Sequence, residues 1–249
     1  MKGFIFAAGI GSRLKPFTQH HPKALVEVGG KPMLLHVIDR MLEAGISDIT
    51  INTHHFSQQI IDYVSSLSKD ALFHISDESQ QLLDTGGGLL HAASFIEGEE
   101  PLLIHNADIL SNIDFHQLLK CHESSNADAT LAEQSYRKSS RMLFYDSTNR
   151  LSGWENIATG ETRPTGFNPD GYTSCAFSGV HIITPSRVIP TLRRYALSHG
   201  NVFSIIPFYL DNLSSLRVST CSISENTQWH DIGKPETLEA ARRHFPLNS

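Results

Sequence analysis

The stretch Gly3-Phe-Ile-Phe-Ala-Ala8, followed at once by Gly9-Ile-Gly-Ser-Arg13, decides the class of fold that we expect. A short apolar run of this kind is typical of a parallel strand that is buried on both faces of its sheet. The run is too short for a signal peptide, and a glycine-rich loop stands where a cleavage site would follow. We therefore predict that residues 3–8 form a central strand.

Segments with the apolar spacing of helices and of strands alternate after this strand. The spacing predicts strands over 48–53, 72–75 and 101–105, and helices over 32–45, 56–67, a stretch after the loop 77–88, and 114–122. This alternation predicts an α/β fold, a Rossmann-like doubly wound sheet that is mixed but mainly parallel, with helices on both faces. Ligands of such sheets bind at the carboxyl ends of the strands, so we expect the loops 9–23, 77–88 and 106–109 around one crevice.

The pattern changes after Ala127. We predict a hairpin of 142–145 with 151–154, strands over 172–183 and 215–223, a loop over 229–233 and a last helix over 235–245. No internal repeat or linker separates the two parts. We therefore interpret residues 1–249 as one domain, in which the first half, 1–126, carries the glycine-rich loop and the second half, 127–249, is a small β-rich elaboration.

Composition and charge exclude several classes of protein. Of the 249 residues, 40% are hydrophobic and 18% are charged, which excludes a disordered chain. A net charge of −6 and the lack of any run of 18 apolar residues argue against nucleic-acid and membrane partners. The first 31 residues hold five lysines and arginines against one acid, whereas residues 70–114 hold nine acids and no lysine or arginine. This asymmetry suits a polyanion beside a divalent cation, although two solvated faces of opposite charge would give it too.

The cysteines and histidines give no sign of a metal or redox motif. Cys121, Cys175 and Cys221 are far apart in sequence, so there is no Cys-x-x-Cys pair. Three sparse cysteines suit reduced thiols, and we expect a cytoplasmic protein. The adjacent pairs His20-His21 and His54-His55 would not place two ligands on one face of a helix, which argues against zinc.

The glycine-rich loop does not fit either common phosphate-binding motif. A dinucleotide fingerprint needs glycine at position 14, where Leu14 stands, and the Gly-Lys-Ser/Thr of a Walker loop is absent. The full string is Gly9-Ile-Gly-Ser-Arg-Leu-Lys-Pro-Phe-Thr-Gln-His-His-Pro-Lys-Ala-Leu25. It resembles the signature of the sugar-1-phosphate nucleotidyltransferases, G-x-G-x-R-L-x-P-x-T-x-x-x-P-K-x-L, at every fixed position.

The resemblance implies roles for this loop. Ala8, Gly9 and Gly11 would hold the nucleotide, because residues without bulky side chains let backbone amides approach phosphate oxygens. Arg13 would reach the β- and γ-phosphates and the leaving pyrophosphate, and Lys23 would contact the phosphates at the reacting centre. Both cations would stabilise charge where it develops during the reaction.

A second glycine-rich segment, Leu83-Asp-Thr-Gly-Gly-Gly-Leu89, precedes a predicted helix. In the family, the matching loop contacts the base and ribose, which would make Asp84, Thr85, Gly86 and Gly87 nucleotide-binding residues, with Glu78 as a further base contact. Asp84 stands where many relatives have glycine, and this resembles uridylyltransferases that act on N-acetylmuramic acid 1-phosphate. Asp84 or Thr85 could also simply cap the helix.

Two carboxylates are expected to bind Mg²⁺. Asp108 follows the predicted strand 101–105, in the sequence Asn106-Ala-Asp108, which resembles the family's G-D or N-x-D turn. Asp231 lies in Trp229-His-Asp-Ile-Gly-Lys-Pro235, which resembles the family's second metal segment. Mg²⁺ usually takes one or two protein carboxylates together with phosphate oxygens and water.

The resemblance also implies a sugar-binding side made of Asn106, Glu155, Ser178 and Gly179. Glu155 falls where relatives hold sugar hydroxyls, and Ser178-Gly179 ends a small-residue strand that could equally be ordinary core. Asn156 replaces the usual lysine that contacts the sugar phosphate, and Trp154 could stack on the sugar or fill the core.

These features predict an enzyme that converts a nucleoside triphosphate and a sugar 1-phosphate to a nucleotide sugar and pyrophosphate. The substrates that we expect are UTP and N-acetylmuramic acid 1-phosphate, as in cell-wall recycling. Alternatives are a mannose- or heptose-1-phosphate guanylyltransferase using GTP, and a regulatory protein that binds nucleotide sugars without catalysis. We expect a monomer or homodimer without the C-terminal left-handed β-helix of bifunctional relatives.

Overall fold

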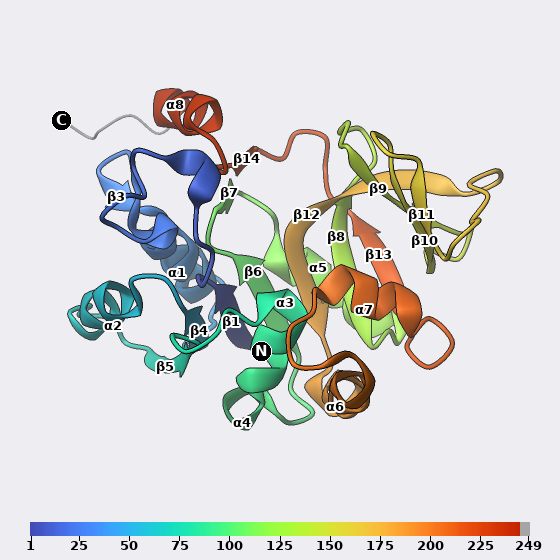
Figure 1. Cartoon of the computed structure of the whole chain (residues 1–249), viewed down its shortest axis with the longest axis horizontal. Coiled ribbons are helices and arrows are strands. Elements are labelled where there is room, and N and C mark those ends of the chain that lie inside the picture. The colour runs from blue at the N-terminus through green and yellow to red at the C-terminus, as the bar shows by residue number, and fades with distance from the viewer. Residues whose placement is uncertain (245–249) are drawn as a thin grey trace.

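A parallel four-stranded core lies at the centre of the computed structural model, which describes residues 1–244 (Figure 1). Its strands are β5 (Leu72–Asp77), β4 (Asp48–Thr53), β1 (Lys2–Phe6) and β6 (Leu102–Asn106), in this spatial order. Phe4 and Ile5 on β1 are fully buried, on opposite faces of the sheet. The apolar run at the N-terminus is therefore a central strand, as predicted.

The sheet continues into the second half of the chain through β12 (Thr173–Ile183), which pairs with β6 in antiparallel orientation. One end of β12 pairs with β8 (Ala129–Gln134), which in turn pairs with β13 (Val218–Ser222). The other end pairs with β9 (Arg141–Tyr145), followed by β10 (Leu151–Asn156) and β11 (Glu161–Arg163). The predicted hairpin is thus β9–β10, and a third strand extends it.

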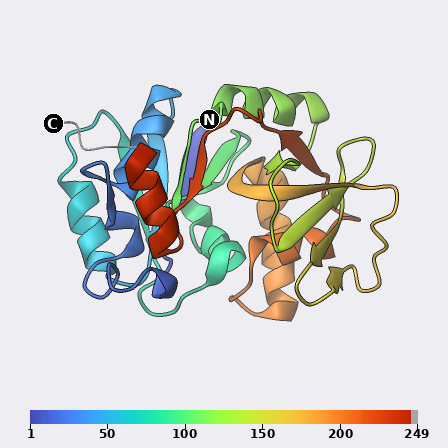
Figure 2. The same ribbon diagram turned by 90° about the horizontal axis from the view of Figure 1, so that it is seen from above.

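Helices cover both faces of this sheet, and each set has its own core. On one face, α1 (Met33–Glu43), α2 (Ser57–Ser65) and α5 (Phe115–Ser125) pack on Ile5 and Leu103. On the other, α3 (Asp84–His91), α4 (Ala93–Ile96), α6 (Pro185–His199) and α7 (Ile205–Asp211) pack on Phe4 and Ile104. Figure 2 shows α5, in green, and α6, in orange, on opposite sides of the strands. The doubly wound α/β prediction is confirmed.

A third small core closes the site end of the molecule. Helix α8 (Pro235–His244) lies over the N-terminal loop and α1, where Leu238 packs with Leu14, Met33 and Ile232. Two small two-stranded sheets border this core. In the first, a hairpin, β2 (Glu27–Val28) pairs with β3 (Lys31–Pro32); in the second, β7 (Ile109–Ser111) pairs with β14 (Trp229–Asp231) from the far end of the chain. The predicted end of the last helix, Phe245, lies outside the described residues.

The structure corrects two predicted loops and the prediction of reduced thiols. Residues 229–233 were expected as a loop, but Trp229–Asp231 form β14, because β7 offers a partner strand. The predicted loop 77–88 ends at Leu83, because α3 begins at Asp84. Cys121 on α5 and Cys221 on β13 form a disulfide bond with Cα atoms 6.1 Å apart. In residues 1–244, no helix is both long and apolar enough to cross a membrane.

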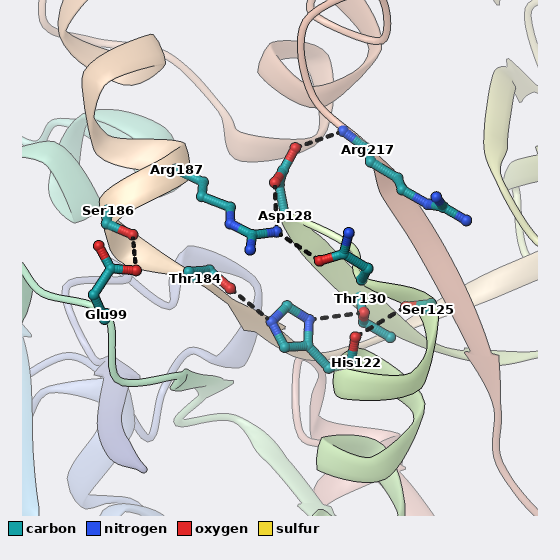
Figure 3. A network of polar contacts seen from close by, with 10 residues as sticks. Glu99, His122, Ser125, Asp128, Thr130, Thr184, Ser186, Arg187 and Arg217 are labelled. Atoms are coloured by element: carbon teal, nitrogen blue, oxygen red, sulfur yellow. Dashed lines mark hydrogen bonds and ion pairs between the residues drawn. The ribbon is translucent and has the colours of Figure 1, made fainter.

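A buried polar network ties α5 to the second half of the sheet (Figure 3). Asp114 caps the start of α5, because its Oδ1 accepts hydrogen bonds from the amides of His116 and Gln117. Near the other end of this helix, the ring nitrogens of His122 lie 2.9 Å from Oγ1 of Thr130 and 3.0 Å from Oγ1 of Thr184. His122 therefore joins α5 to β8 and to the residue before α6.

Candidate active site

Two adjoining cavities open at the carboxyl ends of the central strands. The first, about 370 Å³, is lined by the glycine-rich loop and by residues that follow β1 and β6, among them Ala8, Gly9, Lys23 and Asp108. The second, about 580 Å³, lies towards β9–β12. Phe6, Thr85 and Asn106 line both. The predicted crevice is therefore present, and it has two compartments.

The glycine-rich loop follows β1 and folds back through two short 3₁₀ turns, η1 (Ser12–Leu14) and η2 (Lys23–Leu25). Gly11 has φ 67°, a left-handed conformation that favours glycine, and Oγ1 of Thr18 donates a hydrogen bond to its carbonyl at 2.8 Å. Leu14 is fully buried and anchors the loop. Gly9 borders open space on the wall of the first cavity.

Pairing of β7 with β14 brings the two predicted metal carboxylates together across 123 residues of sequence. Asp231 is opposite Ile109, the residue after Asp108, and the amide of Ile232 donates to the carbonyl of Asp108 at 2.8 Å. Nζ of Lys23 donates to Oδ2 of Asp108. Lys23, Asp108 and Asp231, predicted from three separate motifs, thus meet at one place.

Arg13 lies beside the carboxylate of Asp231. A Cβ atom placed on Gly233 would be 2.8 Å from Oδ1 of Asp231 and 3.3 Å from Nη2 of Arg13, so both groups crowd this glycine. Burial raises the pKa of Asp231 and the charge of Asp108 raises it further, whereas Lys23 and Arg13 oppose both effects. The carboxylates repel each other, and cations surround them.

The chemistry of this pair fits Mg²⁺. Carboxylate oxygens are hard ligands, and a divalent cation would relieve the repulsion between Asp108 and Asp231. Residues 1–244 contain no group of three or more histidine, cysteine or acidic side chains that could hold a metal alone. Substrate phosphates and water would have to complete the coordination of an ion bound here.

The glycines of the second glycine-rich segment bring α3 close to the connection between α6 and α7. The amides of Gly86 and Gly87 donate to the carbonyl of Phe203, at 2.8 and 3.1 Å, and both glycines are buried. Their lack of side chains lets α3 touch the segment that joins α6 to α7, since a Cβ on Gly87 would lie 2.0 Å from the carbonyl oxygen of Asn201. The structure does not bring Gly86 or Gly87 to the cavity wall.

Asp84 and Thr85 line the first cavity and also hold the start of α7. Oγ1 of Thr85 accepts a hydrogen bond from the amide of Ile205 at 2.9 Å, and the carboxylate of Asp84 accepts one from Oγ of Ser204. The N-cap residue of α3, Leu83, makes no side-chain capping bond, but Oδ1 of Asp84 accepts a hydrogen bond from the amide of Thr85 at 2.6 Å. Asp84 has φ 59°, a conformation that most residues with side chains rarely adopt. Asp84 thus contacts the first turn of α3 as well as the start of α7, whereas Thr85 accepts its hydrogen bond from α7.

Glu78 lies behind the wall of the cavity, not on it. Its buried carboxylate accepts hydrogen bonds from Nδ2 of Asn52 at 2.7 Å and from the amide of Leu83 at 3.2 Å. Oδ1 of Asn52 in turn accepts from the amides of Ala7 and Ala8, at 2.8 and 3.3 Å. Glu78 therefore positions Asn52 and the end of β1, and the structure does not support it as a direct base contact.

Ser178, Gly179 and Asn106, three of the four residues that the resemblance implied for sugar binding, lie together on the wall of the second cavity. A break in the β12–β8 register falls between Phe177 and His181, so this part of β12 bulges. Gly179 has φ 80°, and a Cβ there would approach Nδ2 of Asn106 to 3.0 Å. The bulge needs this glycine to bring β12 against Asn106.

The structure does not bring Glu155 to this cavity. Trp154 lines the cavity, and because successive strand residues point to opposite faces, Glu155 points away from it. The carboxylates that do line it are those of Glu161 on β11 and Asp231 on β14. Trp154 lines the cavity and also packs against the core.

Sequence reasoning also missed Arg137 and His181 on the wall of the second cavity. His181 is 1% exposed, and neither ring nitrogen has a hydrogen-bond partner among the described residues. Burial lowers its pKa to about 3. A polar residue in an otherwise apolar strand was the available signal for His181; nothing marked Arg137.

Comparisons of sequence with known proteins agree with this geometry. A family model described as nucleotidyl transferase matches residues 2–142. An N-acetylmuramate α-1-phosphate uridylyltransferase of Caulobacter vibrioides is 29% identical over 95% of this chain and 93% of its own length. A mannose-1-phosphate guanyltransferase of Yarrowia lipolytica is 27% identical over 95% of this chain, which spans 61% of that protein.

Comparison with solved structures shows the same fold. A putative glucose-1-phosphate thymidylyltransferase from Bacillus anthracis superposes with a TM-score of 0.81 at 20% identity, over all of this chain and 97% of the other. HddC from Yersinia pseudotuberculosis, in complex with GMP-PN, superposes with a TM-score of 0.72 at 20% identity, over 98% and 99%.

Proposed function

The chain belongs to the nucleotidyl transferase family, and from this we propose that it joins a nucleoside triphosphate to a sugar 1-phosphate, releasing pyrophosphate. An oxygen of the sugar phosphate attacks the α-phosphorus, a new P–O bond forms, and the bond to the β-phosphate oxygen breaks. The attacking oxygen is already ionised at neutral pH, so no general base is needed. Positioning and neutralisation of charge then supply the catalysis.

The observation that carries this proposal is the meeting of Lys23, Asp108 and Asp231, with Arg13 beside Asp231, where the two cavities adjoin. Arg13 and Lys23 supply positive charge for a transferring phosphoryl group and a leaving pyrophosphate. We assign the first cavity to the nucleotide, through Ala8, Gly9, Asp84 and Thr85, with Gly11 shaping the loop that carries Gly9. We assign the second cavity to the sugar, through Asn106, Ser178 and Gly179.

Asp108 and Asp231 would hold Mg²⁺. When bound, the ion would neutralise phosphate charge and hold phosphate oxygens in the geometry of in-line attack. Lys23 would contribute in two ways, because its ammonium contacts Asp108 and lines the first cavity.

We further propose UTP and N-acetylmuramic acid 1-phosphate as the substrates. The sequence Asp84-Thr-Gly-Gly-Gly88 and the similarity to the Caulobacter uridylyltransferase along nearly the whole of both chains support this pair. GTP with mannose 1-phosphate is the second candidate, because the similarity to the Yarrowia guanyltransferase also extends over 95% of this chain.

The test is release of pyrophosphate in the presence of Mg²⁺. UTP, GTP, CTP and dTTP are each combined with the 1-phosphates of N-acetylmuramic acid, N-acetylglucosamine, mannose and glucose. We expect the highest kcat/KM with UTP and N-acetylmuramic acid 1-phosphate, and no turnover when Mg²⁺ is chelated. A preference for GTP and mannose 1-phosphate would replace the first candidate with the second. Binding of nucleotide without pyrophosphate from any pair would contradict the proposed reaction.

A further inference from the structure

Arg137, in the loop between β8 and β9, is held on three sides at the second cavity. Its Nε donates to Oε1 of Gln134 at 2.6 Å, and its Nη2 donates to the carbonyl of Phe177 at 2.7 Å. Its guanidinium carbon lies 4.2 Å from the centre of the Trp229 ring. The bulge in β12 makes this arrangement possible, since the next carbonyl, of Ser178, accepts a hydrogen bond from Nε1 of Trp229 at 2.8 Å.

The guanidinium of Arg137 can still donate hydrogen bonds to a ligand. Nη1 of Arg137 has no hydrogen-bond partner in the described part of the chain, and no carboxylate there lies within ion-pair distance of the side chain. A cation that is partly removed from water without a direct partner costs free energy, which an anionic ligand would recover. A planar fork held in one orientation is suited to bind phosphate in a bidentate manner.

The position of Arg137 indicates which anion this would be. Trp229, on which the guanidinium stacks, is two residues before Asp231, and Arg137 is close enough to Asp231 to influence it electrostatically. Asp231 also lines the second cavity. An anion bound to Nη1 would therefore lie between the sugar compartment and the carboxylate pair, where the phosphate of a sugar 1-phosphate must lie to attack a nucleotide in the first cavity.

Two other arginines in the second cavity are less suited to this task. Arg163 already has two carboxylates nearby. Its Nε lies 3.8 Å from Oε1 of Glu161, and its Nη1 lies 3.8 Å from Oδ1 of Asp211. Arg141 is exposed, and no contact fixes its guanidinium among the described residues. Asn156, at the position where the resemblance would place a phosphate-binding lysine, uses its Oδ1 to accept from the amide of Ala158 at 3.1 Å.

We propose that Arg137 binds the phosphate group of the sugar 1-phosphate and orients its attacking oxygen towards the nucleotide. This inference rests on the proposed function and adds a binding residue to it. It also explains how this chain could dispense with a lysine at position 156. Loss of a charge-assisted hydrogen bond at such a site is expected to weaken binding about 10- to 100-fold.

The test compares Arg137→Ala, Arg137→Lys and Arg141→Ala with Arg217→Ala, which removes the same charge from an exposed position outside both cavities. KM for the sugar 1-phosphate should rise about 10- to 100-fold in Arg137→Ala and less in Arg137→Lys, with KM for UTP unchanged. Calorimetric titration with the sugar 1-phosphate alone should show the same weakening. Arg217→Ala should match the wild type.

Three results would overturn the proposal. An unchanged KM for the sugar 1-phosphate in a folded Arg137→Ala protein would exclude phosphate binding, and an equal rise in both KM values would indicate a structural role. A larger effect of Arg141→Ala would place the phosphate at the outer arginine. If Arg137→Ala does not fold, Arg137→Lys decides on the same criteria. A wild-type chain that releases no pyrophosphate from any pair would end the proposed function and this inference together, whereas the three results above end this inference alone.

Discussion

At the scale of single residues, Arg13 and Lys15 illustrate how the position of a charged side chain determines its contribution to catalysis. Both are exposed cations on the same loop, but only Arg13 lies against Gly233 and influences Asp231. We predict that Arg13→Ala lowers kcat about 10²- to 10³-fold, as for loss of one preorganised group that stabilises developing charge. Lys15→Ala should change kcat less than twofold, by roughly the effect of a solvated charge. Steady-state pyrophosphate release measures both, and near-normal turnover of Arg13→Ala would refute its assignment.

The convergence of Lys23, Asp108 and Asp231 could be predicted because Lys23 and Asp231 belong to long motifs and Asp108 directly follows a strongly apolar strand. Glu155 could not be placed by the same reasoning. Whether a strand residue points into a cavity depends on the phase of its strand, and a shift of one residue reverses it. The register of β10 with β9 shifts between Leu151 and Gly153, and we could not predict this shift from the sequence. Arg137 was missed because its role depends on Trp229 and on the bulge in β12.

At the scale of elements, the glycines at the start of α3 set how closely this helix approaches the α6–α7 connection. A Cβ on Gly87 would lie 2.0 Å from the carbonyl oxygen of Asn201 and 3.1 Å from Cβ of Leu83. We predict that Gly87→Ala lowers the free energy of unfolding by about 1–3 kcal/mol, because neither backbone can move without loss of other contacts. Urea denaturation measures the change.

The matched control for this substitution is Gly9→Ala. A Cβ on Gly9 would have no atom within 4 Å, and its φ is not positive, so its unfolding free energy should stay within about 0.5 kcal/mol of wild type. Equal stability of the Gly87 and Gly9 variants would show that close packing of α3 does not explain the glycine at position 87.

The disulfide between Cys121 and Cys221 joins α5 to β13 across 100 residues of sequence. A crosslink that closes a loop of this length restricts the unfolded chain, and we predict that replacing both cysteines with serine lowers the free energy of unfolding by about 2–4 kcal/mol. Denaturation of the wild type with and without reductant provides the internal control. Two free thiols at these positions, found by alkylation and mass spectrometry of unreduced protein, would contradict the prediction.

Elements with regular apolar spacing were predictable, and elements that break the usual rules were not. The stripe of Met33, Leu34, Val37, Ile38 and Met41 on α1 is buried as its spacing predicts. Helix α6 was missed because Pro190 lies inside it, a residue that normally ends a helix. Strand β8 was missed because Glu133 and Gln134 are buried in it, where apolar residues would be usual.

At the scale of the whole molecule, one sheet carries both compartments of the site. Pairing of β12 with β6 joins the parallel core to the antiparallel part, and the bulge in β12 falls beside the boundary of the two cavities. Three histidines in these parts are deeply buried. His105 on β6, His122 on α5 and His181 on β12 are each at most 3% exposed.

This burial predicts how stability depends on pH. Burial lowers the pKa of His105 and of His122 to about 4 and that of His181 to about 3, from an ordinary value of 6.5. Between pH 6.5 and about 4, the unfolded chain therefore binds more protons than the folded one. The free energy of unfolding should be level above pH 6.5 and should fall below it, by at most about 1.4 kcal/mol per pH unit for each histidine.

Buried Glu78 and Glu133 act in the opposite direction, because burial raises the pKa of each carboxyl group above 4.5. Substitution of one histidine separates its contribution to the pH dependence of stability from that of the two carboxyl groups. His122→Gln removes the group that titrates in the network of Figure 3, so the pH slope of its unfolding free energy should be shallower than that of the wild type by up to about 1.4 kcal/mol per unit. His116→Gln, at an exposed position on the same helix, should keep the wild-type slope. Urea denaturation at several values between pH 7 and pH 4.5 measures both, and parallel slopes for all three proteins would show that His122 is not buried in its neutral form.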